Sequence, residues 1–488
     1  MSAARRRGIA AASPVHGLAR RSVGYFDVLG QSVAALAPSA AATTIPMLTF
    51  AVAAGGSAIA VLIAAVIALG VAASVNVFAK RVAAAGSIYT YVSLGLGPGA
   101  SRLSGAAMLL GYGLIAVFEL FAAAHFVGHA LGGGPTVAIA LGAALGGVLL
   151  AVMFGGIRLS TRLMLVVEVA TVAALLVVVI ALLLVLPIEP ADLLPAPVGF
   201  DRIVLGVVVT MSAFVGFESA VALGVEARRP FKVIPRALLL TVAVSGAVFV
   251  FVALAGLAAG GALGFERIVN DSPFDAVAQV YGARWAAVVL DLLVGFSFFA
   301  AAVAACTAFV RILFSMAREG TLPAALGRTH ARTGVPTVAT LACLPLVLTP
   351  VILRASGMDL RGAMDTVVVA AVAAFVLGYV LVCAAVVPFL RRIGELTAWQ
   401  AVRSVISAVV LAASLVAFLA IAAASGRAGG VVLFVAALAA AAAALTAWRH
   451  RPGGGGRRGV ARDVPLASDV LGGERALEAT GPGARTSP

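Results

Sequence analysis

Long apolar runs recur along almost the whole chain and are separated by short segments that carry most of the charged residues. A helix that crosses a bilayer needs about 20 predominantly apolar residues, whereas a membrane-barrel strand alternates polar and apolar residues over about ten positions. The runs follow the first pattern and predict an all-α polytopic membrane protein with about 12 transmembrane helices. The predicted spans are Phe26–Phe50, Ser57–Phe78, Leu103–Leu131, Thr136–Met153, Leu163–Leu186, Val204–Val225, Leu238–Ala259, Ala286–Ala317, Thr337–Leu353, Thr366–Leu390, Val405–Ala424 and Ala428–Trp448.

Composition supports the membrane assignment. The chain is 62% apolar and 11% charged, with a mean hydropathy of +1.12, whereas soluble domains average about 25% charged residues. The net charge of +14 is typical of nucleic-acid binding, but here the basic residues lie between apolar runs rather than on one soluble face. We therefore expect the lipid bilayer, and no nucleic acid, as a partner.

The basic residues also predict the orientation. With the N-terminus in the cytoplasm, six of the 34 lysines and arginines lie on the outer side and the other 28 face the cytoplasm. This asymmetry predicts a multi-pass protein of the plasma (cytoplasmic) membrane with both termini cytoplasmic. Residues 1–24 and 450–488 are poor in large apolar residues, so we expect both segments to be disordered.

The sequence carries no pattern typical of an enzyme. The three cysteines lie inside apolar runs without paired spacing, and the five histidines form no metal-binding motif, so no metal or cofactor is expected. There is no phosphate-binding glycine loop and no nucleophile aligned with a base. A membrane-embedded enzyme would need polar residues that converge at one depth, whereas this chain has scattered single acids.

The first predicted span is interrupted in its middle. Pro38 removes a backbone donor and clashes with the preceding turn, and it is followed by the small residues Ser39, Ala40 and Ala41. Unwound backbone at membrane depth frees amides and carbonyls for a ligand. The alternative is a simple proline kink without a binding role.

The sixth predicted span contains a second interruption. Gly216 is a flexible point, and Glu218 places an ionisable group near the middle of the membrane. Such a charge is costly in hydrocarbon and marks a functional candidate, although a structural hydrogen bond to a neighbouring helix would also explain it. Three other acids, Glu119, Glu168 and Asp291, lie within spans, and each suits either a proton-carrying or a structural role.

The two interruptions lie five spans apart. This spacing predicts two five-helix halves related by inversion, whose broken helices cross near the membrane centre. We expect the first repeat at residues 25–200, the second at 201–392, and two further spans at 393–449.

Several stretches resemble the amino acid–polyamine–organocation superfamily of permeases. They are Gly86–Val92 followed by Gly95 and Gly97, Phe214–Glu218, Glu226–Pro230, Ile234–Ala237, Arg311–Pro323 and Gly334–Pro336. The resemblance implies a leucine-transporter-like fold, with a 5+5 inverted repeat and two peripheral helices. It also implies a secondary active transporter that moves amino acids by alternating access.

The resemblance further implies where the substrate binds. The carboxylate would meet free amides of Ser39, Ala40 and Ala41, and the ammonium would meet carbonyls of Ala37, Ala213 and Phe214, with Phe217 beside the side chain. The full set of implied substrate contacts is Ala37, Pro38, Ser39, Ala40, Ala41, Ala213, Phe214, Val215, Gly216 and Phe217. Proton coupling is expected at Glu218, with Glu119 and Glu168 as further candidates.

Departures from the family pattern keep alternatives open. The carboxylate-binding triad is usually glycine-rich, and a lysine that some relatives carry in span five is absent here, where Glu168 is the charged interior residue. Ser297 would suit a sodium site, so the coupling ion is either H⁺ or Na⁺. The main alternative function is a permease or exchanger of the same fold for polyamines, amines or other organic cations. A passive channel is disfavoured because no filter-like repeat is present.

Overall fold

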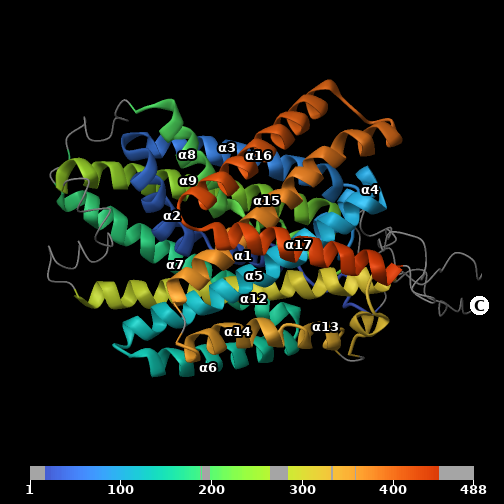
Figure 1. The fold of residues 1–488 in the computed structure, drawn as a ribbon, viewed down its shortest axis with the longest axis horizontal. Coiled ribbons are helices and arrows are strands. Elements are labelled where there is room, and N and C mark those ends of the chain that lie inside the picture. The colour runs from blue at the N-terminus through green and yellow to red at the C-terminus, as the bar shows by residue number, and fades with distance from the viewer. Residues whose placement is uncertain are drawn as a thin grey trace, which may run out of the picture.

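The computed structural model describes residues 17–186, 188, 198–263, 284–330, 333–357 and 359–449. Within these ranges the chain is helical, apart from its loops and one isolated bridge between Val23 and Ala227. Most helices lie side by side and run lengthwise in the view of Figure 1. The predictions for residues 1–16 and 450–488 fall outside the described residues.

The spanning helices follow the predicted apolar runs closely. In chain order they are α1 (Tyr25–Leu36) with α2 (Pro38–Ala53), α3 (Ser57–Ala79), α5 (Pro98–Ala130), α6 (Pro135–Phe154), α7 (Ile157–Val185), α8 (Phe200–Met211) with η5 (Phe217–Leu223), α9 (Pro230–Leu263), α12 (Arg284–Arg318), α13 (Thr337–Leu341) with α14 (Leu344–Ala355), α15 (Leu360–Ile393), α16 (Ala398–Ala424) and α17 (Ala428–Arg449). The short helices are η2 (Ala54–Gly56), α4 (Ser87–Leu96), η4 (Ser212–Phe214) and η6 (Ala324–Gly327).

The number of spans agrees with the prediction. Among the described residues, 11 apolar helical stretches are long enough to cross a membrane, and the first of them, Tyr25–Ala79, contains two predicted spans. Helices are favoured in hydrocarbon because they satisfy their backbone hydrogen bonds internally. Helices α2, α5 and α6 each begin with a proline, which lacks the amide that would have no partner in a first turn.

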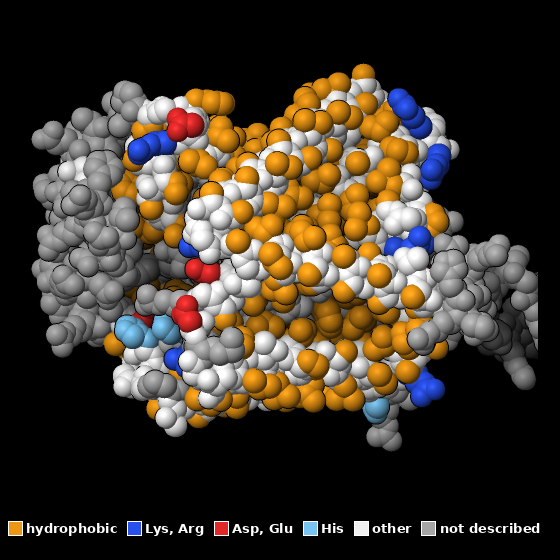
Figure 2. Space-filling view, in the orientation of Figure 1, with side chains coloured by type: hydrophobic (Ala, Val, Ile, Leu, Met, Phe, Trp, Pro, Cys, Tyr) orange, Lys and Arg blue, Asp and Glu red, His pale blue; other side chains and the backbone are white. Residues whose placement is uncertain are grey.

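The surface is divided as a membrane requires. Figure 2 shows hydrophobic side chains covering the middle of the visible face, with charged side chains at its two ends. On this face, most of the visible lysine and arginine side chains lie at the end where the C-terminus lies. The visible acidic side chains lie towards the opposite end, together with histidine and some basic side chains. Helices α16 and α17 are the least buried spans and pack on α15 at the periphery.

Residues 17–24 are ordered, and the prediction of disorder is wrong for this part of the N-terminal segment. Leu18 and Val23 are buried, and Val23 pairs with Ala227 in the isolated bridge. Burial of apolar side chains and pairing of backbone groups offset the loss of conformational entropy. The start of the first half is thereby attached to the loop that follows span six.

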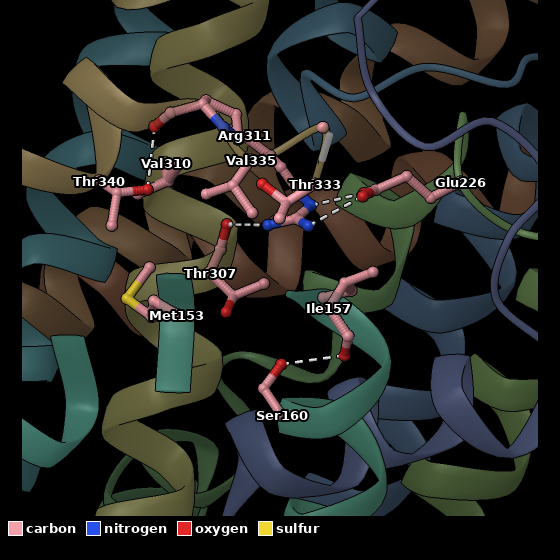
Figure 3. A pocket seen from close by; sticks show the side chains of 12 residues that line it. Met153, Ile157, Ser160, Glu226, Thr307, Val310, Arg311, Thr333, Val335 and Thr340 are labelled. Carbon is pink, nitrogen blue, oxygen red and sulfur yellow. Dashed lines mark hydrogen bonds and ion pairs between the residues drawn. The ribbon is translucent and has the colours of Figure 1, made fainter. Parts of the chain in front are cut away.

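A buried ion pair joins this loop to α12. Nε of Arg311 donates to Oε2 of Glu226 at 2.7 Å, and Nη2 donates to Oε1 at 3.1 Å (Figure 3). Both side chains are almost fully buried, so each charge depends on the other for compensation. The bidentate geometry fixes the position of α12 relative to the end of span six.

We expect Arg311→Met to destabilise the protein by about 3–5 kcal/mol, because it leaves the Glu226 carboxylate buried and unpaired. The measurement is the thermal unfolding midpoint of the purified protein in detergent. Arg81→Met is the matched control, because the Arg81–Glu395 pair is partly exposed and should contribute less than about 1 kcal/mol. Equal losses in the two variants would contradict this account, and adding Glu226→Leu to Arg311→Met should restore much of the stability.

Candidate functional site

The first span is broken at one residue. Helix α1 ends at Leu36, α2 begins at Pro38, and Ala37 between them has a left-handed conformation with φ 49° and ψ 59°. A proline disfavours the helical conformation of the residue before it, which explains why the break falls at Ala37. The break is buried inside the protein.

This break creates unpaired backbone groups in the protein interior. The amides of Ser39 and Ala40 lie in the first turn of α2 and have no acceptor within the helix. The amide of Ala41 donates to the Ala37 carbonyl at 2.8 Å. The Ala37 carbonyl, expected to bind the ammonium, therefore already accepts one hydrogen bond. The carbonyls of Ala35 and Leu36 lie in the last turn of α1, where no following helical amide pairs with them.

The sixth span is broken over a longer stretch. Helix α8 ends at Met211, η4 follows, Val215 is extended, and Gly216 has φ 92° before η5 begins. The carbonyls of Ala213 and Phe214 lie at the end of η4, where no following helical amide is available. A side chain at Gly216 would be strained by this φ and would overlap the Ala35 carbonyl oxygen.

The structure brings the two breaks together. Oγ of Ser32 on α1 donates to the Phe217 carbonyl at 2.7 Å. Oγ of Ser219 on η5 donates to the Gln31 carbonyl at 3.0 Å. These bonds hold the start of η5 against the second half of α1. The amides at the start of α2 and the carbonyls at the end of η4 therefore belong to one central region.

Glu218 is fully buried and accepts hydrogen bonds from two tyrosines. The Tyr112 hydroxyl on α5 donates to Oε1 at 2.7 Å, and the Tyr379 hydroxyl on α15 donates to Oε2. The Tyr379 hydroxyl also accepts from the Gly216 amide at 2.9 Å. Sequence reasoning missed both tyrosines, although a tyrosine hydroxyl inside an apolar span is itself a signal for a polar partner.

Glu168 on α7 is buried beside the start of α2. Oγ of Ser297 on α12 donates to Oε1 at 2.7 Å, and Oγ of Ser39 lies 3.4 Å from Oε2. The Ser39 amide also faces this carboxyl group. Oγ of Ser39 donates to Oγ1 of Thr171 at 2.9 Å. The Ser297 hydroxyl, which the sequence suggested for a sodium site, therefore contacts the Glu168 carboxyl group.

The remaining acids have different surroundings. Glu119 on α5 is buried, and its Oε2 has no hydrogen-bond partner among the described residues. Asp291 pairs with His129 at 2.6 Å, where both side chains are partly exposed. Asp27 accepts from the Gly24 amide at the start of α1, as a helix cap does. Glu119 and Glu168 stay candidates for a proton role, and Asp291 is part of an exposed pair.

Apolar side chains surround the break in span one. Ala37 and Ala40 belong to a cluster with residues of α5 and α12, namely Ala122, Ala123, Val294, Phe298 and Ala301. Phe217 packs against Tyr379, with ring centroids 5.6 Å apart, whereas Phe214 packs against Phe249 of α9 at 5.1 Å. Phe217 therefore lies on the α15 side of the break and Phe214 on the α9 side.

Comparison with known proteins identifies the family. A family model described as amino acid permease matches residues 29–443 of the chain. This chain belongs to the amino acid permease family. It is similar to the branched-chain amino acid permease BcaP of Bacillus subtilis, with 26% identity over 353 residues that cover 66% of this chain and 72% of the relative. As a member of this family it is a multi-pass membrane transporter, not an enzyme.

Two further similarities bear on this permease. Cationic amino acid transporter 2, a vacuolar protein of Arabidopsis thaliana, is 27% identical over 146 residues, which cover 30% of this chain and 22% of that protein. The structure of a manganese transporter from Eremococcus coleocola aligns with a TM-score of 0.50 at 14% identity, covering 86% of this chain and 94% of the other. This likeness concerns the fold alone, and the fold is the leucine-transporter-like one that the sequence predicts.

The permease has one cavity beside the break in span one and another around the Glu226–Arg311 pair. One, of about 340 Å³, lies between α1, α7 and α9, and Pro38, Glu168 and Thr241 line it together with mostly aliphatic side chains. The other lies around the Glu226–Arg311 pair and is lined by residues of α7, α12 and α13 (Figure 3). The carboxyl group of Glu168 thus lies between the α2 N-terminus and an apolar cavity.

We expect Gly216→Ala to lower transport by about tenfold or more, because the added methyl group cannot coexist with φ 92° and the Ala35 carbonyl. Uptake into proteoliposomes measures the effect. The control is Gly113→Ala on α5, where a new Cβ would lie 3.5 Å from the Phe309 ring, an ordinary contact. Normal transport by Gly216→Ala would show that the position of this break does not matter.

Proposed function

We propose that this permease moves apolar amino acids across the plasma membrane by alternating access, driven by a proton gradient. The observation that carries the proposal is that the interruptions of spans one and six lie next to each other in the protein interior. The first amides of α2 and the last carbonyls of η4 have no helical hydrogen-bond partner, and both sets of groups are buried. A zwitterion needs such a pairing of donors and acceptors, because each of its charges must be compensated away from water.

The helix geometry supports separate places for the two charges of the substrate. A helix N-terminus carries partial positive charge and unpaired amides, so the start of α2 at Ser39–Ala41 suits the carboxylate. The ammonium suits the carbonyls at the ends of α1 and η4, including those of Ala213 and Phe214. Gly216 lets the chain between η4 and η5 lie directly against the Ala35 carbonyl of α1.

The surroundings of the break favour an apolar substrate side chain. Ala122, Ala123, Val294 and Phe298 pack with Ala37 and Ala40 in one apolar cluster, which suits an aliphatic side chain. The relative named as a branched-chain amino acid permease agrees with this choice. We therefore propose leucine, isoleucine and valine as the first compounds to test.

The second candidate function is transport of amines or cationic amino acids. Two buried acids favour it: Glu119, whose Oε2 has no hydrogen-bond partner among the described residues, and Glu168. A buried carboxylate binds a cation well. The partial similarity to a cationic amino acid transporter also supports it. For such a substrate, the carboxyl groups would matter more than the amides at the α2 N-terminus.

The decisive experiment is uptake into proteoliposomes under an imposed proton gradient or an imposed sodium gradient. We expect labelled leucine to accumulate only with the proton gradient, and we expect competition only from compounds that bear both a carboxylate and an amine. Isoamylamine, arginine and putrescine are the discriminating competitors. Accumulation of putrescine without leucine would replace the first proposal by the second, and accumulation driven by sodium alone would overturn proton coupling.

Glu218 is proposed to respond to protonation because it links the broken span six to α5 and α15 through Tyr112 and Tyr379. We expect Glu218→Gln to abolish gradient-driven accumulation while leaving leucine exchange between the two sides. Both activities can be measured in the same proteoliposomes. If Glu218→Gln still accumulates leucine with the wild-type dependence on the gradient, Glu218 has no part in coupling.

We propose that both termini lie in the cytoplasm, in keeping with the basic residues at the end of the molecule that carries the C-terminus (Figure 2). The three native cysteines are buried, so they should give little background with thiol reagents. We expect a membrane-impermeant maleimide to label Ser425→Cys on whole cells and to leave Ala398→Cys unlabelled until the cells are opened. The reverse pattern would invert the orientation.

A further inference from the structure

A carboxyl group of the protein itself occupies the N-terminus of α2. Glu168 faces the Ser39 amide, and its Oε2 lies 3.4 Å from the Ser39 hydroxyl. These are the donors that the proposed function offers to the substrate carboxylate. Glu168 is 129 residues away in sequence and reaches this point because α7 packs along α1 and α2.

Hydrogen bonds connect Glu168 to α2 and α12. Oγ of Ser39 lies 3.4 Å from Oε2, to which it donates, and it also donates to Oγ1 of Thr171 at 2.9 Å. Oγ of Ser297 donates to Oε1 at 2.7 Å. Together with the Ser39 amide, these hydroxyls are the donors that an ionised Glu168 uses at the start of α2.

Few other charges act on Glu168. Among the described residues of the helices packed against α7, Asp27 pairs with Arg162, Asp291 with His129 and Arg311 with Glu226. The basic residues of α9, Lys232 and Arg236, lie in its first turns, and α2 and α6 carry no charged residue. Glu119 on α5 is a second buried acid whose carboxyl group lies close enough to interact with that of Glu168.

We propose that Glu168 and the substrate carboxylate exclude each other as anions, so that the permease binds its substrate only when Glu168 is protonated. Two carboxylates that share one buried set of donors cannot both be ionised. Substrate binding therefore takes up one proton, and that proton travels with the substrate when the site opens to the other side. This inference rests on the proposed function. It assigns the proton that is taken up on substrate binding to Glu168 of α7, whereas Glu218 is proposed to couple protonation to span six.

The test is equilibrium binding of labelled leucine to the purified, detergent-solubilised protein as a function of pH. For the wild type we expect Kd to be constant at low pH and to rise about tenfold per pH unit above a midpoint. For Glu168→Gln we expect a Kd that stays at the low-pH value throughout. Glu395→Gln, which neutralises an exposed acid at the end of α15, is the matched control and should keep the wild-type curve.

A second variant keeps the inference testable if Glu168→Gln does not fold. Ser297→Ala removes a donor from the ionised carboxylate without changing the charge, so the midpoint should move to higher pH. Three outcomes would overturn this inference and leave the proposed function standing. They are an unchanged midpoint in Ser297→Ala, a Kd of Glu168→Gln that rises with pH as in the wild type, and a wild-type Kd that does not depend on pH. A Kd that falls as pH rises would show that Glu168 binds the ammonium instead. Absence of leucine binding to the wild type at every pH would overturn the proposed function as well.

Discussion

The structure depends on one constraint, which is that backbone amides and carbonyls in a membrane must find partners inside the protein. Continuous helices meet this constraint on the lipid-facing surface. The two interrupted spans do not, and they are tolerated because Ala37 and Gly216 are buried among other helices. The chain therefore concentrates its unpaired backbone groups in one central region. This is the region that we propose for the carboxylate and the ammonium of the substrate.

The same constraint explains why the buried acids Glu218 and Glu168 are surrounded by hydrogen-bond donors. Glu218 receives two tyrosine hydroxyls, and Glu168 receives serine hydroxyls from two different helices. Each acid thereby connects spans that belong to different parts of the chain. A change in protonation would alter contacts between these spans, and this is the physical route by which a proton gradient can act on a conformational equilibrium.

The end that carries the C-terminus is held together more tightly than the sequence suggests. The segment at Leu18–Val23 pairs with the loop after span six, and the Glu226–Arg311 pair attaches that loop to α12. These contacts connect three segments at this end, namely the residues before α1, the loop after span six and α12. Any opening towards that side has to break or displace these contacts, so their stability bears on which state the permease prefers.

The sequence alone determined the twelve spans and the two interruptions, because apolar length and proline or glycine position are local properties. Family resemblance then predicted the fold and transport of amino acids. Tertiary structure decided which groups meet. It placed Tyr112 and Tyr379 on Glu218, and it placed Glu168 at the start of α2, across separations of more than 100 residues. Such contacts depend on how helices rotate and pack against one another, and hydropathy carries little information on rotation when a span is apolar all round.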